Sequence, residues 1–356
     1  MSAAGAEGWL LGIEVGGTKL QLGLGRADGS LAALERLDVN PARGARGILH
    51  QIEAAICTLL HRMMLSPHDV RGIGVGFGGP VDVSRGRVHT SYQVEGWTDF
   101  PLAEKLRRST GIAAVVIEND ADTAGLAEAR FGAGVGCSPL LYLTIGSGIG
   151  GALIVEGQIY RGCGLGAVEI GHMEIPVRSR SGIRIMQLEE VASGWGIARE
   201  ARDEALGLSI SSQERRKWVV LERSNNDPQA ITAKHVAQAA IEGEERAEAI
   251  LDRAREGVAF ALRQAIAVLA PGRIILGGGV SLIGEAHWFE PIRGLVEAGV
   301  FAPFRGSYDI VPAALGEEVV VHGALALAHN AVVSSSRVQS SAPAGSCGAA
   351  GSASRS

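Results

Sequence analysis

Two glycine-rich turns lie in the chain on either side of an isolated Asn119-Asp120 pair. The first turn is Gly16-Gly17-Thr18-Lys19, and the second is Gly146-Ser147-Gly148-Ile149-Gly150-Gly151. Glycine has no Cβ, so its backbone N–H group can approach an anion closely. A carboxylate between two such turns is where a phosphoryl-transfer enzyme would keep its base. The arrangement therefore predicts a kinase.

The first turn offers the Thr18 hydroxyl, the Lys19 ammonium group and the backbone N–H groups of Gly16 and Gly17. All of these groups suit phosphate oxygens. Turns of this composition also occur in plain β-hairpins, so the first turn alone fits both interpretations.

The second turn places four glycines and the hydroxyl groups of Thr144 and Ser147 among the apolar segments 140–145 and 152–155. Glycine loses more conformational entropy on ordering than any other residue, which makes this turn a costly plain connection. A phosphate cradle with Gly146 and Gly148 beside the anion is the favoured interpretation.

Asp120 directly follows a strand predicted over residues 115–117. Ligand sites in α/β proteins collect at the carboxyl ends of such strands. Asp120 could instead cap the helix predicted over 121–131, a role that Asp122 could fill equally well. Catalysis and capping both stay open from this segment alone.

Two later segments carry residues suited to a sugar and to a nucleotide. Glu169 and His172 could accept and donate hydrogen bonds to polyol hydroxyls, although an interior histidine is the ordinary alternative for His172. Gly277-Gly278-Gly279 follows a strand predicted over 273–276 and could let an adenine ring lie against bare backbone. The start of a helix is the alternative for this triplet.

The composition limits the classes of partner. The chain has 356 residues, 46% of them apolar, and its net charge is −5 with 33 basic and 38 acidic residues. No Lys/Arg stripe is present, which argues against nucleic acid and anionic membranes as partners. The four cysteines form no CxxC pair, and no apolar run of about 18 residues is present, so we expect no signal peptide or membrane span. We expect a soluble, cytoplasmic protein with reduced cysteines.

The order of apolar segments predicts an α/β protein of two related lobes with a cleft between them. Residues 9–15 and 20–24 predict a β-hairpin, 72–77 a strand, and 44–64, 244–269 and 319–331 helices. We expect a disordered lead over 1–8 and a disordered Ser/Ala/Gly tail over 334–356. The small lobe is expected over 9–118, completed by the helix near 319–332, and the large lobe over 119–318.

Taken together, these segments resemble the ROK family (repressors, open reading frames and kinases) of the hexokinase–actin-like ATPase superfamily. The matching motifs, in family order, are Gly12–Lys19, Gly76–Asp82, Gly96-Trp97, Glu118–Ala121, Thr144–Gly151, Glu169–His172, Leu188–Gly194 and Ile275–Val280. The resemblance spans roughly residues 9 to 332. The resemblance implies a two-lobed actin-like ATPase (ribonuclease H-like) fold with a central cleft.

The resemblance also implies transfer of the γ-phosphate of ATP to a hexose hydroxyl, with Asp120 as the general base. Sugar contacts would come from Gly79, Asn119, Glu169, His172 and Glu189. ATP would be held by Gly16, Gly17, Thr18, Lys19, Thr144, Gly146, Ser147, Gly148, Gly278 and Gly279. Mg²⁺ would neutralise phosphate charge. Dimers are frequent in the family, so we expect a homodimer.

Two departures from the family pattern stand out. Many members bind zinc through the histidine equivalent to His172 and three cysteines that follow it, but residues 173–187 contain no cysteine. Without thiolates no structural zinc is expected, and packing must hold this loop. Glu14 stands where the commoner residue is Asp, and its longer side chain could still reach Mg²⁺ through water.

Glucose, phosphorylated to glucose 6-phosphate, is the first choice of substrate; fructose, mannose and N-acetylhexosamines stay open. The alternatives to an enzyme are a ROK-type sugar-binding regulator and a non-catalytic sugar or nucleotide binder. Family regulators carry a DNA-binding segment before the first strand, whereas only eight residues precede Trp9 here.

Overall fold

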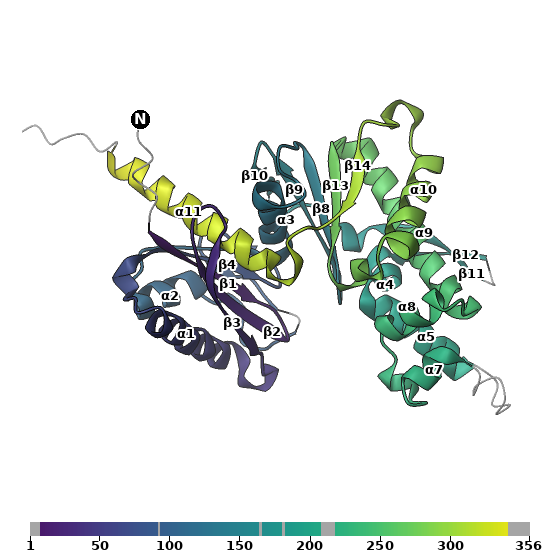
Figure 1. Cartoon of the computed structure of the whole chain (residues 1–356), viewed down its shortest axis with the longest axis horizontal. Coiled ribbons are helices and arrows are strands. Elements are labelled where there is room, and N and C mark those ends of the chain that lie inside the picture. Colours follow the sequence, from purple (N-terminus) through teal and green to yellow (C-terminus); the bar gives the residue numbers. More distant parts are fainter. Residues whose placement is uncertain (1–7, 92, 164–165, 180–181, 208–217, 341–356) are drawn as a thin grey trace, which may run out of the picture.

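A computed structural model of the chain describes residues 8–91, 93–163, 166–179, 182–207 and 218–340. It has two lobes, each built on one five-stranded sheet (Figure 1). The strand orders are β3-β2-β1-β4-β7 and β10-β9-β8-β13-β14. In each sheet three antiparallel strands are followed by two parallel ones. The predicted α/β class and the repeated theme of two related lobes are confirmed.

The first sheet sets up one edge of the site. Its strands are β1 (Trp9–Val15), β2 (Lys19–Gly25), β3 (Leu31–Asp38), β4 (Val70–Phe77) and β7 (Ala114–Asn119). In the parallel register Val15 pairs with Phe77, and Phe77 with Asn119. The carboxyl ends of three strands therefore meet, and the residues that follow them lie at one edge of the sheet.

Helices cover both faces of the first sheet (Figure 1). α1 (Gly44–Arg62) buries Ile48, Ile52 and Ile56 at helical spacing, and α2 (Leu102–Thr110) packs in the same core. The short strands β5 (Val81–Asp82) and β6 (Arg87–Val88) form a separate ribbon beside them.

The opposite face of the first sheet carries α11 (Val319–Ser340), the last described element. A Cβ on Gly74 of β4 would lie 1.9 Å from the Ala324 carbonyl oxygen, so glycine permits this close approach. α11 is longer than the predicted helix: residues 334–340 continue it, and the expected tail does not begin at 334. Residues 1–7 and 341–356, expected to be disordered, lie outside the described part of the chain.

The second sheet consists of β8 (Leu140–Ile145), β9 (Ile149–Val155), β10 (Gln158–Ile159), β13 (Arg273–Gly277) and β14 (Asp309–Pro312). Alternate side chains divide its two faces. Leu140, Tyr142 and Ile275 share a core with α3 (Asp120–Phe131) and α11, whereas Leu141 and Ile274 share the larger core with the remaining helices. Those helices are α4 (Leu188–Ala192), α5 (Gly194–Gly207), α7 (Val219–Arg223), α8 (Ala233–Ile241), α9 (Glu245–Leu269) and α10 (Glu290–Gly299).

In the segment expected as a loop, the strands β11 (Glu174–Ser179) and β12 (Gly182–Gln187) pair antiparallel. Ile175 is fully buried, and its side chain lies against Gly257 of α9. Apolar packing therefore supports this segment. Among the described residues, no helix has the length and apolar character needed to cross a membrane.

Candidate active site

A cavity of about 410 Å³ contains groups from both lobes. Glu14 and Lys19 of the small lobe line it together with Asp120 at the start of α3 and Thr144 of β8. Gly278 and Gly279, after β13, line it as well. Six of the residues predicted from the sequence are thus brought together.

Asp120 is the first residue of α3, but Asn119 caps the helix. The Asn119 Oδ1 accepts hydrogen bonds from the backbone N–H groups of Ala121 at 2.9 Å and Asp122 at 3.2 Å. The capping role that seemed open for Asp120 is therefore taken by its neighbour. The Asp120 carboxylate keeps one bond, accepted from its neighbour Ala121 N–H at 2.9 Å.

The environment of Asp120 suits a proton acceptor. Burial raises the pKa of its carboxyl group from 3.8 to about 6, and the nearby charges of Glu14 and Glu169 also raise it. A base with a pKa close to neutrality is both ionised at pH 7 and strong enough to take a proton.

Asn119 also orients the loop that follows β4. Its Nδ2 donates to the Gly79 carbonyl oxygen at 3.2 Å, so two residues predicted to contact sugar lie side by side. Gly79 has φ +155°, within the range that disfavours side chains. Gly78 directly follows β4, and a Cβ there would lie 3.5 Å from the Asp120 carboxylate.

The first glycine turn joins β1 to β2, as predicted. Lys19 Nζ lies 3.3 Å from the Glu14 carboxylate and donates to the Glu317 carbonyl oxygen at 3.4 Å. Gln21 Nε2 donates to the same carboxylate at 2.7 Å. Burial raises the pKa of Glu14, although Lys19 and Gln21 oppose that effect. Lys19 is therefore paired with Glu14 at the mouth of the first turn.

Two members of the first turn differ in their surroundings. Thr18 is exposed, so its hydroxyl is available to a ligand. A Cβ on Gly17 would lie 1.4 Å from the Gln93 amide oxygen, so packing against Gln93 already requires glycine there. Gly16 donates its N–H to the Lys19 carbonyl oxygen at 2.9 Å and closes the turn.

The second glycine turn has an open side and a packed side. Apart from its two chain neighbours, no atom of the described residues lies within 4 Å of where a Cβ on Gly146 would be, and Ser147 is exposed. A Cβ on Gly148 would lie 2.5 Å from the Glu189 carboxylate, which accepts the Ile149 N–H at 2.7 Å. Glu189, predicted to bind sugar, is therefore fixed against the turn predicted to bind phosphate.

Glu169 and His172 lie at opposite ends of a short 3₁₀ segment, and both are exposed. The interior-histidine alternative for His172 is therefore wrong. Glu169 is close enough to Asp120 for its charge to raise the pKa of that carboxyl group.

Gly278 has φ +84°, and a Cβ there would lie 2.6 Å from the Ile145 carbonyl oxygen. It caps the 3₁₀ helix Gly279–Ile283, so the helix-start alternative holds for this triplet. Gly278 and Gly279 nevertheless line the cavity beside Leu282 and Phe289, whose side chains are apolar. Both interpretations of the triplet are therefore compatible with the structure.

Behind Asp120 lies a charged cluster that the sequence reasoning did not single out. Glu118 is 2% exposed, and its carboxylate accepts a hydrogen bond from Arg161 Nε at 2.8 Å. Asp122 is also buried, and burial and the Glu118 charge raise its pKa to about 8. A charged residue at the end of a buried strand was the available signal for Glu118.

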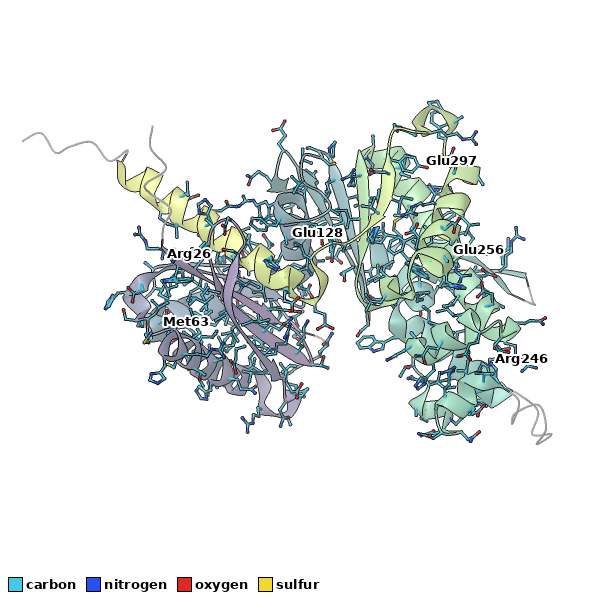
Figure 2. The ribbon with its side chains drawn as sticks, viewed as in Figure 1. Arg26, Met63, Glu128, Arg246, Glu256 and Glu297 are labelled. Atoms are coloured by element: carbon cyan, nitrogen blue, oxygen red, sulfur yellow. The ribbon has the colours of Figure 1, made fainter. Side chains whose placement is uncertain are left out.

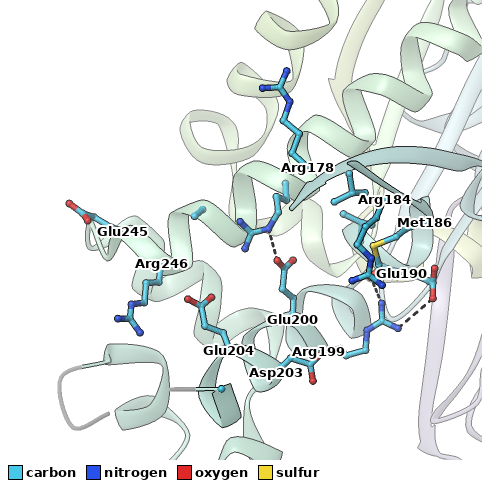
Figure 3. A pocket seen from close by; sticks show the side chains of 15 residues that line it. Arg178, Arg184, Met186, Glu190, Arg199, Glu200, Asp203, Glu204, Glu245 and Arg246 are labelled. Carbon is cyan, nitrogen blue, oxygen red and sulfur yellow. Dashed lines mark hydrogen bonds and ion pairs between the residues drawn. The ribbon is translucent and has the colours of Figure 1, made fainter. Parts of the chain in front are cut away.

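A larger cavity of about 780 Å³ lies away from these residues, among the β11–β12 hairpin, α5 and α9 (Figure 3). Two ion pairs lie in its wall, with Arg253 2.5 Å from Glu200 and Arg199 3.6 Å from Glu190. It contains none of the predicted catalytic or binding residues. We therefore place the candidate site in the smaller cavity.

The carboxylates near the cavity are candidate ligands for a metal ion. In the described part of the chain, no three His, Cys, Asp or Glu side chains come together as a metal site. Glu14 and Asp120 are close enough to influence one another. One or two carboxylates completed by substrate phosphates are the usual protein share of a Mg²⁺ site. The residues present fit Mg²⁺ in that way.

Comparison with known proteins places the chain in a family. The ROK family profile matches residues 10–331. The chain belongs to the ROK family. Glucokinases of Halalkalibacterium halodurans and Thermotoga maritima are each 30% identical over 89% of this chain, and the alignments cover 94% and 96% of those proteins.

The structure of a ROK family glucokinase from Streptomyces griseus, in complex with glucose and AMPPNP, has a TM-score of 0.74 and 29% identity to this ROK protein. The alignment covers 91% of this chain and all of that one. The family and the two-lobed actin-like fold predicted from the sequence are confirmed.

Proposed function

We propose that this ROK protein transfers the γ-phosphate of ATP to a hexose, with glucose as the acceptor and glucose 6-phosphate as the product. The broader class, an ATP-dependent sugar kinase, agrees with the prediction and with the glucokinase relatives. The observation that carries phosphoryl transfer to a hydroxyl group is the Asp120 carboxylate, with its pKa near 6, in a cavity lined by both lobes. The choice of glucose is supported by the glucokinase relatives.

In this proposal Asp120 accepts the proton of the sugar hydroxyl while the oxygen of that hydroxyl attacks the γ-phosphorus of ATP. A positioned base contributes typically ~10²–10⁴-fold to such a step, and alignment of the reactants contributes much of the rest. The Asn119 cap and the bond to Gly79 hold the backbone beside Asp120 in place. This fixation supports a base that is oriented before the sugar binds.

ATP would lie in the cavity with its adenine against Gly278 and Gly279 and its phosphates toward Lys19 and Thr144. The open backbone at Gly146, with Ser147 and Gly148, and the first turn would contact the terminal phosphates. Glu14, through water, would hold Mg²⁺, which neutralises developing phosphate charge when bound. Lys19 could then exchange its bond with Glu14 for one with a phosphate oxygen.

The sugar would lie between Asp120 and the segment that carries Glu169, His172 and Glu189. These side chains offer hydrogen-bond acceptors and an imidazole N–H donor to ring hydroxyls. Buried polar groups that a wrong sugar leaves unpaired provide most of the discrimination in sites of this kind. Assembly as a homodimer stays a prediction from the family resemblance, and a cytoplasmic location stays a prediction from the composition of the sequence.

The test is ADP release with Mg²⁺-ATP across glucose, fructose, mannose and N-acetylhexosamines. Asp120→Asn should lower turnover on the preferred sugar by ~10²–10⁴-fold. Asp203→Asn, on the exposed side of α5, is the matched control and should behave as the wild type. Full turnover in Asp120→Asn would contradict the role of Asp120, and a preference for another hexose would replace glucose as the substrate.

A further inference from the structure

Glu128 is a fully buried carboxylate on α3 whose role the proposed chemistry does not explain. It accepts three hydrogen bonds, all from backbone N–H groups. Ala133 donates to Oε2 at 2.7 Å, and Ala314 and Leu315 donate to Oε1 at 2.9 and 3.0 Å. Ala133 belongs to the turn after α3, whereas the other two donors lie almost 190 residues away in sequence.

The distant donors belong to a connection between the lobes. The chain passes from the first sheet to the second at the junction of β7 and α3, and returns through residues 313–318 to α11. Figure 2 places Glu128 between the two lobes. Its carboxylate therefore ties the return connection to the helix that forms the first connection.

The same connection forms part of the proposed nucleotide site. Ala313, Gly316 and Glu317 line the 410 Å³ cavity. The Glu317 carbonyl oxygen accepts hydrogen bonds from Lys19 at 3.4 Å and from Gln21 at 3.0 Å. A displacement of residues 314 and 315 would therefore move one cavity wall and disturb the partners of the first glycine turn.

We propose that Glu128 is a positioning residue for the nucleotide: it holds residues 313–317 in the conformation that ATP and ADP bind. The inference rests on the proposed function, because it assigns the cavity to a nucleotide. A carboxylate suits the task, since its two oxygens accept from both sides and charged acceptors form the stronger hydrogen bonds to N–H groups. Glutamine has one acceptor oxygen and cannot satisfy both sides.

The experiment compares Glu128→Gln with the full-length wild type. The dissociation constants of ADP and of glucose are measured by calorimetry, and KM for ATP and for the sugar by ADP release. We expect ADP binding and KM for ATP to weaken about tenfold, within the ~10²-fold that a small misplacement can cost, and glucose binding to stay within twofold. Glu256→Gln, exposed on α9, is the matched control.

Unchanged ADP binding in folded Glu128→Gln, or equal weakening of ADP and glucose binding, would overturn the proposal. If the variant does not fold, hydrogen exchange of peptide 313–318 in the wild type decides. Protection before ADP is added supports a conformation already held by Glu128, and protection that appears only with ADP contradicts it. Sugar turnover by the wild type tests the kinase, whereas ADP affinity tests Glu128, so the two can fail separately.

Discussion

The pKa of Asp120 leads to a quantitative expectation for the pH dependence of the reaction. An ordinary aspartate has a pKa of 3.8 and is largely ionised throughout the range in which enzymes are assayed, whereas burial raises the pKa of Asp120 to about 6. The base is active only when ionised. Activity should therefore begin to fall just on the acidic side of neutrality, whereas an ordinary aspartate would lose its charge only near pH 4.

The size of the effect follows from the titration. With a pKa of 6, about 90% of Asp120 is ionised at pH 7 and about 10% at pH 5, so kcat/KM for the sugar should drop about tenfold between them. Glu14 is the nearby charge that raises this pKa most, although burial is the larger cause. Removing that charge in Glu14→Gln should move the acidic limb toward lower pH.

The assay is kcat/KM for glucose from pH 4.5 to 8, with Mg²⁺-ATP saturating at every pH. ATP phosphates also titrate near neutrality, so the shift of the limb in Glu14→Gln, normalised to its own plateau, identifies the protein group. A wild-type limb near pH 4, or a limb near 6 that stays fixed in Glu14→Gln, would refute the assignment to Asp120.

Three further predictions concern residues around the site. Burial raises the folded-state pKa of Asp122 from 3.8 to about 8, so its contribution to stability is present below pH 4 and is lost as pH rises through about 8. Asp122→Asn should therefore raise Tm more at pH 8 than at pH 5. A larger gain at pH 5 in thermal melts would oppose this. Arg161→Met leaves the buried Glu118 carboxylate without its ion-pair partner and should lower the free energy of unfolding in denaturant by about 1–2 kcal/mol. This is less than for a fully buried pair, because the Arg161 side chain is 41% exposed. The double variant with Glu118→Gln should recover most of that loss, and no recovery would disprove the pairing argument. Gly148→Ala puts a Cβ 2.5 Å from the Glu189 carboxylate and should raise KM for the sugar more than KM for ATP. A larger rise in KM for ATP, measured by steady-state kinetics, would contradict this.

The sequence predicted the elements with strong local signals. The hairpin around the first glycine turn, the strand before Asn119 and the helix ending at Leu269 occur almost as expected, because apolar spacing and glycine or proline boundaries define them locally. The β11–β12 hairpin was missed, although Ile175 and Val177, and Ile183 and Ile185, stand at the two-residue spacing of a strand. α11 runs past residue 333 because no helix-breaking residue intervenes.

The site was predicted less completely than the fold. The two turns and Asp120 could be found because their glycines and carboxylate are local features. The role of Asn119 as the cap could not be separated from capping by Asp120, since the choice depends on the direction of one side chain. The pairings of Glu118 with Arg161 and of Glu128 with residues 314 and 315 join distant segments, and nothing in their spacing marks them.

The position of α11 bears on how the protein is made in the cell. Its residues form part of the small lobe, where Gly74 and Gly12 allow its backbone to touch β4 and β1, yet it is synthesised about 300 residues after β1. At roughly 5–20 residues per second, about 15–60 s separate the two during translation. Throughout that interval the growing chain exposes one uncovered face of the first sheet. We therefore expect a ribosome-bound chaperone to bind that face until the final helix emerges.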